Sequence, residues 1–113
     1  MENEKLIVLW VTRDKEAALN MAFLYAKNSK LRGWWNEVDL IIWGPSVILA
    51  VGDEDIKAEL KVMIEAGVRL RACQNCAERY GAADALRELG VDVTFMGAPL
   101  TEELKSGSKV ISI

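Results

Sequence analysis

The sequence predicts an α/β fold in three layers, in which helices cover both faces of a five-stranded parallel sheet. Two observations predict this class. Apolar runs of strand length alternate with amphipathic helical stretches along all 113 residues, and the connections between them are short. Such alternation is typical of parallel strands joined through right-handed helical crossovers. We expect one domain over residues 1–113, because the chain is long enough for a single core and too short for a second.

The first half of the chain contains two expected strands. KLIVLWV, residues 5–11, is a continuous apolar run, which favours a strand buried on both faces. A helix is expected from Asp14, a suitable capping or first-turn acid, to about Lys30. VDLIIW, residues 38–43, is the second strand; Gly44-Pro45-Ser46 ends it, and a short apolar segment follows. The first helix carries apolar residues at helical spacing on one face: Ala18, Met21, Ala22 and Tyr25.

The second half contains three expected strands. DEDIKAELKVMIEAG has the pattern of a regular amphipathic helix, with acids in its first turn and Gly67 as its stop. VRLRAC is the third strand, and a helical region follows from about Asn75 to Gly90, bent near Gly81. We interpret VDVTFMG as the fourth strand, TEELKSG as a short helix and KVISI as the terminal strand.

Composition narrows the classes of function. The net charge of −3 and the pI near 5.0 argue against a general nucleic-acid or membrane-surface binder. No apolar run approaches the roughly 18 residues of a membrane span, and the amino-terminal stretch lacks the pattern of a secretory signal. We therefore expect a cytoplasmic protein.

The chain contains no histidine, which excludes Ser-His-Asp and Cys-His catalysis and histidine metal ligands. We expect no metal and no cofactor.

The loops that follow the strands supply the candidate site. In parallel α/β sheets, ligands and chemistry gather beyond the carboxyl ends of the strands. By the predicted topology, four segments meet there: Thr12-Arg13, Trp43 to Ser46, Cys73 to Cys76 and Met96 to Pro99. We assign the chemistry to Cys73 and Cys76. The candidate substrate-binding residues are Thr12, Arg13, Gly44, Pro45, Ser46, Gln74, Asn75 and Gly97.

The position of the cysteines suggests how a thiol could be activated without histidine. Cys73 ends the third strand, and Cys76 lies in or near the first turn of the next helix. Backbone N–H groups and the helix dipole at such a position stabilise a thiolate and lower its pKa. Arg71 stands two residues before Cys73 and is expected on the same face of the strand. Alternatively, Arg71 pairs with a nearby acid or extends to solvent.

The C-x-x-C spacing is compatible with four kinds of site. A zinc site is disfavoured, because two thiolates are half of a tetrahedral ligand set. Buried, inert thiols are common among free cysteines. Thiol–disulfide chemistry and sulfur transfer through a Cys73 persulfide remain, and spacing alone does not separate them. A Cys73 buried away from solvent would count against both and leave a binding module.

Three segments, DLIIWGPS, EAGVRLRACQNCAERYG and GVDVTFMGAPLTEEL, resemble the DsrE/DsrF-like family, and the resemblance covers nearly the whole chain. This family includes YchN-type proteins and TusD-type sulfur relay subunits. Its functional cysteine matches Cys73, and the glycine eight residues later matches Gly81. Relay members often have Arg where this chain has Tyr80, with Arg79 one place earlier. Cys76 is a second departure from the relay subunits and is similar to the C-x-x-C form of YchN-type members.

The resemblance implies a five-stranded DsrEFH-like fold, assembly into homotrimers or hexamers, and a cysteine that carries a persulfide between a donor and an acceptor protein. Three hypotheses follow. In the first, the protein is a sulfurtransferase or sulfur carrier with Cys73 as nucleophile and Cys76 as a resolving or assisting thiol. In the second, it is a redox protein that uses both cysteines as a disulfide pair. In the third, it is a non-catalytic oligomeric binding module.

Overall fold

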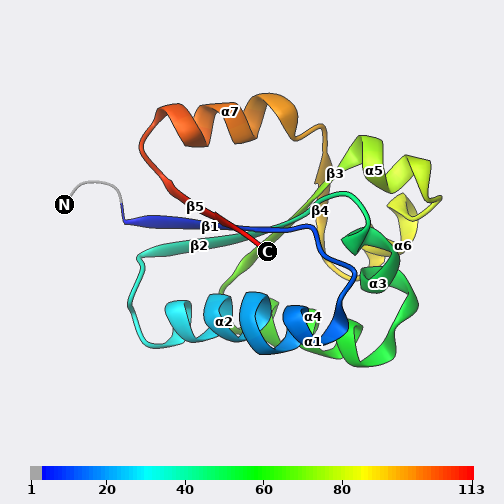
Figure 1. Ribbon diagram of the computed structural model, residues 1–113, viewed down its shortest axis with the longest axis horizontal. Helices are drawn as coiled ribbons and strands as arrows, with labels where there is room; N and C mark the ends of the chain where they lie inside the picture. Colours follow the sequence, from blue (N-terminus) through cyan, green and yellow to red (C-terminus); the bar gives the residue numbers. More distant parts are fainter. Residues whose placement is uncertain (1–3) are drawn as a thin grey trace.

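Five parallel strands form one sheet in the order β4-β3-β2-β1-β5 (Figure 1). The computed structural model describes residues 4–113. Every neighbouring pair of strands is parallel, which confirms the predicted fold class. The strands are β1 (Lys5–Trp10), β2 (Glu37–Ile42), β3 (Arg69–Cys73), β4 (Asp92–Thr94) and β5 (Lys109–Ser112).

Helices cover the two faces of the sheet unequally. In Figure 1, α1, α2 and α4 lie along one face, whereas α7 lies alone over the other. None of the side chains of α7 is fully buried. Within residues 4–113, every helix is too short or too polar to span a bilayer. The helices are α1 (Lys15–Ala17), the π-helical segment η1 (Ala18–Phe23), α2 (Leu24–Leu31), α3 (Ser46–Gly52), α4 (Glu54–Ala66), α5 (Gln74–Arg79), α6 (Ala83–Glu88) and α7 (Gly97–Lys105).

Alternation along the strands divides the core into two apolar clusters. Successive side chains of a strand point to opposite faces of the sheet. Leu6, Val8 and Trp10 of β1 therefore belong to the larger cluster, on the side of α2 and α4. The smaller cluster, on the side of α7, consists of the buried residues Ile7, Ile41, Cys73 and Met96. The third strand thus ends with its cysteine inside the smaller cluster.

The predicted helices are present, with three changes in their bounds. The first helix begins at Lys15, and the carboxylate of its N-cap residue Asp14 accepts a hydrogen bond from the Ala17 N–H at 3.0 Å. A π-helical segment interrupts this helix. The predicted helical region from Asn75 to Gly90 is two helices, because Gly81 adopts a positive φ of 64° between them. The helix expected over TEELKSG starts earlier, at Gly97, so Met96 to Pro99 is not a free loop.

The larger cluster provides a test of the core. Leu60 of α4 is completely buried, and Leu104 of α7 is 57% exposed. We expect Leu60→Ala to lower the free energy of unfolding by about 2–5 kcal/mol, because it leaves a cavity under α4. The matched control Leu104→Ala should change it by no more than about 0.5 kcal/mol. Urea titration followed by circular dichroism measures both, and equal losses would contradict this division of the core.

Candidate functional site

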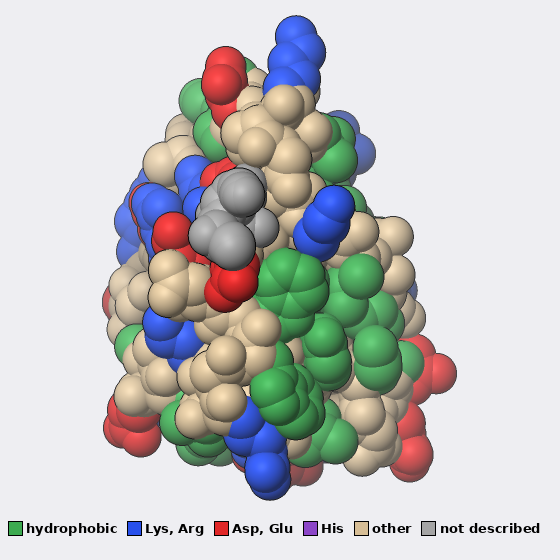
Figure 2. Space-filling model, turned by 90° about the vertical axis from the view of Figure 1, so that its left-hand side faces the viewer, with side chains coloured by type: hydrophobic (Ala, Val, Ile, Leu, Met, Phe, Trp, Pro, Cys, Tyr) green, Lys and Arg blue, Asp and Glu red, His purple; other side chains and the backbone are tan. Residues whose placement is uncertain are grey.

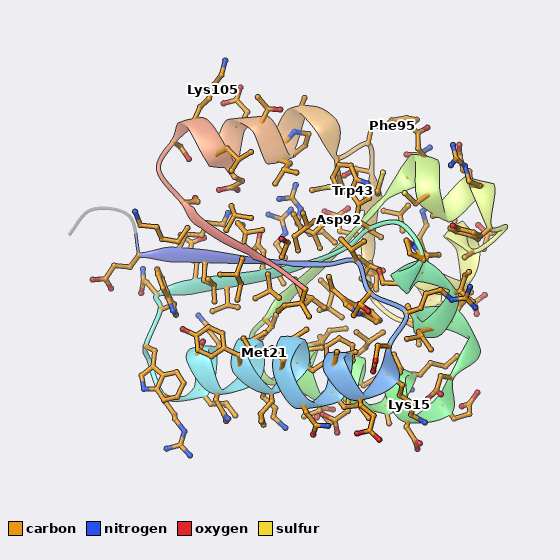
Figure 3. All side chains as sticks on the ribbon, viewed as in Figure 1. Lys15, Met21, Trp43, Asp92, Phe95 and Lys105 are labelled. Carbon is orange, nitrogen blue, oxygen red and sulfur yellow. The ribbon has the colours of Figure 1, made fainter. Side chains whose placement is uncertain are left out.

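The candidate site lies at the carboxyl edge of the sheet, where the ends of β2, β3 and β4 meet. Cys73 lies opposite Thr94 in the register of β3 and β4. The backbone N–H of Gly44, in the turn after β2, donates to Cys76 Sγ at 3.2 Å. Figure 3 shows Trp43 and Phe95 on the α7 side of the sheet at this end. The turn after β2 and the C-x-x-C segment are therefore in contact, as the sequence predicts.

The two cysteines differ in their access to solvent. Both are free thiols. Cys73 is only 4% exposed and belongs to the smaller cluster, whereas Cys76, in the first turn of α5, is partly exposed and packs against both clusters. Cys76 packs against the smaller cluster that contains Cys73, and the neighbouring Cys73 thiol contributes to raising the pKa of Cys76. The burial of Cys73 therefore counts against both chemical hypotheses as far as they require direct attack by this thiol, and favours the binding module. Cys76 is the thiol that solvent reaches.

The electrostatic environment of Cys76 differs from the sequence-based expectation. Burial raises the pKa of Cys76; the hydrogen bond from the Gly44 N–H opposes this, and contact with Cys73 raises the pKa further. Arg79 lowers it slightly, and the net direction is upward. The expected lowering by the helix N-terminus is therefore wrong for Cys76. The physical reason is that burial, the largest effect, disfavours the charged thiolate more than the Gly44 N–H and Arg79 favour it.

The turn after β2 is held by a buried serine. Ser46 is completely buried. Its hydroxyl donates to the Trp10 carbonyl at 2.7 Å and accepts from the Trp43 N–H at 3.2 Å. Gly44 adopts a positive φ of 68°, a conformation that favours glycine, and Pro45 is the N-cap of α3. The hydroxyl of Ser46 is thus used to fix the turn, which leaves the Gly44 N–H directed at Cys76.

The remaining predicted residues make local contacts. Thr12 Oγ1 accepts from the Asp14 N–H at 3.0 Å at the start of α1, and Arg13 is exposed. Gln74 donates to Glu78 within α5 at 2.9 Å, next to the exposed Asn75. Gly97 is the exposed first residue of α7. Their proposed roles in substrate binding stay predictions.

Arg71 belongs to a buried ionic network under α7. Its Nη1 lies 3.5 Å from Asp39 Oδ2, and Lys5 Nζ lies 3.5 Å from the same carboxylate. Lys5 also contacts Glu103 of α7 at 2.7 Å, and Glu103 accepts from the Ser108 hydroxyl at 2.7 Å. The alternative that Arg71 pairs with an acid is confirmed. The network joins β1, β2 and β3 to the helix that covers Cys73.

Phe95 is an exposed neighbour of the site that the sequence analysis did not select. It follows β4 directly and is 57% exposed. The available signal was an aromatic residue immediately after a strand that ends at the carboxyl edge. Residues 4–113 contain no ligand-sized cavity and no cluster of three or more metal-ligating side chains. Neither cysteine therefore lines a ligand-sized cavity within the described residues.

Comparisons with known proteins support this description. The model of the DsrE/DsrF-like family matches residues 6–113. The solved structure of BT1422, a conserved protein of unknown function from Bacteroides thetaiotaomicron, is similar at 44% identity, with a TM-score of 0.95 over 97% of this chain and 95% of that one. A comparison with curated proteins gives no match.

Two more distant structures share the fold. YchN from E. coli is 16% identical, with a TM-score of 0.76 over 98% of this chain and 99% of that one. MTH1491, a protein of unknown function from Methanobacterium thermoautotrophicum, is 20% identical, with a TM-score of 0.77 over 98% of this chain and 100% of that one. At such identities the likeness concerns the fold alone.

The ionic network predicts how acid affects the attachment of α7. Burial alone would raise the pKa of Glu103, but the hydrogen bonds from Lys5 and Ser108 outweigh burial, and the pKa is lowered. A lowered carboxyl pKa contributes stability that is present above the unfolded pKa, about 4.3. That stability is lost as the pH falls through the folded pKa.

We expect Glu103→Gln to lower the melting temperature at pH 7, because it removes the charge that Lys5 contacts. The difference from the wild type should shrink as the pH falls below about 4.3. Thermal unfolding between pH 7 and pH 3 measures it. The adjacent, exposed Glu102 provides the control: Glu102→Gln should have little effect at any pH. A Glu103→Gln difference that stays constant with pH would contradict the assignment.

Proposed function

Because the chain belongs to the DsrE/DsrF-like family, we propose that it carries sulfur as a persulfide on Cys73 between a donor and an acceptor protein, with Cys76 as the assisting thiol. Family membership supports a sulfur-related role in general, and persulfide transfer is our finer proposal. The observation that carries it is the pair of free thiols at the carboxyl edge of the sheet, where Cys76 packs against the cluster that contains Cys73. We place this activity in the cytoplasm, where thiols remain reduced.

The surroundings of Cys73 suit the storage of a reactive sulfur atom. Ile7, Ile41 and Met96 are completely buried around it, and Cys73 itself is 4% exposed. Thiol exchange depends on the access of the attacking thiol to the sulfur. A persulfide on Cys73 is therefore shielded from thiols in solution, while Cys76 remains adjacent. Transfer between thiols exchanges one S–S bond for another and requires no cofactor.

A thiol–disulfide function is the second candidate. The proximity of the two free thiols favours it, because Cys76 packs against the cluster that contains Cys73. In that reaction, the thiolate of Cys76 would attack the inner sulfur of a Cys73 persulfide. A Cys73–Cys76 disulfide forms, and sulfide leaves with the electron pair of the broken S–S bond. The two candidates therefore differ in which sulfur atom of the persulfide is attacked.

Mass spectrometry of protein treated with cysteine persulfide separates the two functions. We expect the mass of one additional sulfur atom, mapped to Cys73 after proteolysis. Once loaded, Cys76→Ser should retain this sulfur longer than the wild type, because it lacks the thiol that attacks the persulfide. Cys73→Ser is the matched control and should not store sulfur in the shielded position.

Two other results would contradict persulfide carriage. A reversible Cys73–Cys76 disulfide without any added sulfur indicates the redox function. Failure of both cysteines to take up sulfur, when the urea-unfolded protein does take it up, leaves the binding module.

We also propose that the protein forms a homo-oligomer. Figure 2 shows hydrophobic side chains gathered on one part of the surface, next to charged ones. Met21, Leu24 and Trp34, in or just after the helices on the larger-cluster side, are 45%, 46% and 55% exposed. Strand β5 is also an edge of the sheet, with backbone groups available to another chain. A second copy of the chain would bury both features.

Light scattering after size exclusion tests this proposal. We expect a trimer or hexamer for the wild type, and dissociation for the double variant Met21→Glu/Leu24→Glu, because two charges would be buried in the interface. Leu104 is 57% exposed on the opposite side of the sheet. The control Leu104→Glu should leave the oligomer intact. A monomeric wild type, or dissociation by Leu104→Glu alone, would contradict the proposed surface.

A further inference from the structure

The proposed function leaves open how sulfur reaches a buried thiol. Cys73 is 4% exposed and lies under α7 in the smaller cluster. Cys76 is partly exposed and packs against the cluster that contains Cys73. A donor persulfide approaching the carboxyl edge of the closed chain therefore meets Cys76 before Cys73.

Cys76 also has a fixed hydrogen-bond donor that favours its thiolate. The Gly44 N–H lies 3.2 Å from Cys76 Sγ, and a donor to the charged form of a group stabilises that form. The turn that presents this N–H is fixed by Ser46, whose buried hydroxyl bonds to the Trp10 carbonyl and the Trp43 N–H. Ser46 thus acts on Cys76 through the backbone of the turn that presents the Gly44 N–H.

We propose that Cys76 is the thiol that receives sulfur from the donor, and that Ser46 is the positioning residue that holds the Gly44 N–H against it. This inference rests on the proposed function, because it assumes that a persulfide is carried. It assigns the first chemical step to the cysteine that the family resemblance does not select. It also requires no displacement of α7.

The sequence of reactions consists of two exchanges. The Cys76 thiolate attacks the outer sulfur of a donor persulfide, R–S–SH. The donor S–S bond breaks, R–S⁻ leaves with the electron pair, and Cys76 becomes the persulfide. The Cys73 thiol then transfers its proton to Cys76 Sγ as its sulfur attacks the outer sulfur of that persulfide. Cys76 returns to a thiol, and Cys73 holds the sulfur. Neither exchange has a net oxidation.

The groups that act on Cys76 define the direction of the expected effect. Burial raises the pKa of Cys76, contact with Cys73 raises it further, and the Gly44 N–H and Arg79 lower it. Loss of the Gly44 contact should therefore raise the pKa of Cys76 and reduce its thiolate fraction at neutral pH. Loss of Cys73 should act in the opposite direction.

Quenched reactions with cysteine persulfide test the order of the two steps. In the wild type, the added sulfur should map first to Cys76 and later to Cys73. In Cys76→Ser, the initial rate of loading should fall by at least about tenfold, because a direct attack by Cys73 depends on its access. In Cys73→Ser, loading of Cys76 should keep the wild-type rate or exceed it, and the sulfur should stay there.

Alkylation of Cys76 by iodoacetamide, followed by peptide mapping, tests the role of Ser46. Ser46→Ala should slow it about threefold to tenfold near neutral pH, because a rate that follows the thiolate fraction changes tenfold for each pKa unit. The rates should converge at high pH, which a purely structural defect would not produce. Ser29→Ala is the matched control, since Ser29 is equally buried and its hydroxyl has no partner.

A second measurement does not depend on the folding of Ser46→Ala. In the proton–nitrogen-15 correlation spectrum of the wild type, the chemical shift of the Gly44 amide proton should change with pH as Cys76 titrates. This change should be absent in Cys76→Ser. Two results would overturn the role of Ser46. One is a Gly44 chemical shift that does not change as Cys76 titrates. The other is a pH dependence of the Cys76 alkylation rate in Ser46→Ala that equals that in Ser29→Ala.

The outcomes also separate this inference from the proposed function. Sulfur that appears first on Cys73, or at the wild-type rate in Cys76→Ser, overturns the inference while persulfide carriage stands. Sulfur that appears on neither cysteine overturns the proposed function itself.

Discussion

The parallel sheet must be shielded from water on both faces, and this chain covers the two faces unequally. Parallel strands are buried on both sides because helical crossovers pack against them. Here the larger cluster lies under α2 and α4, whereas α7 alone covers the other face without fully burying any of its own side chains. This asymmetry places the smaller cluster, and Cys73 within it, under a thin layer.

Helix α7 is held against the sheet by charged side chains as well as by apolar contacts. Lys5, Asp39 and Arg71 on the sheet form a buried network that reaches Glu103 of α7. Charges taken out of water require good geometry and additional hydrogen bonds, and their removal one at a time is expected to destabilise the fold. Arg71, which the sequence places beside Cys73, is therefore used to hold the sheet and α7 together. The hydrogen bond to Cys76 comes instead from the turn after β2.

That turn connects the fold to the chemistry. A buried hydroxyl, Ser46, satisfies backbone groups of β1 and of the turn after β2, and the geometry it fixes directs one N–H at Cys76. The cysteine pair then consists of a buried thiol suited to storage and a partly exposed thiol suited to exchange. Access and hydrogen bonding distinguish two residues that are chemically identical.

The sequence by itself determined the strands, their parallel arrangement and the edge at which the candidate residues gather. These features follow from the local periodicity of apolar residues and from helix-ending glycines such as Gly67 and Gly81. Both signals act within a few positions along the sequence. The Gly44–Cys76 contact and the Arg71–Asp39 pair each join residues 32 positions apart. The burial of Cys73 likewise depends on residues from other strands, such as Ile7 and Ile41. Only the tertiary structure decided them, because solvent access and pKa depend on which side chains and backbone groups the packing brings around a thiol.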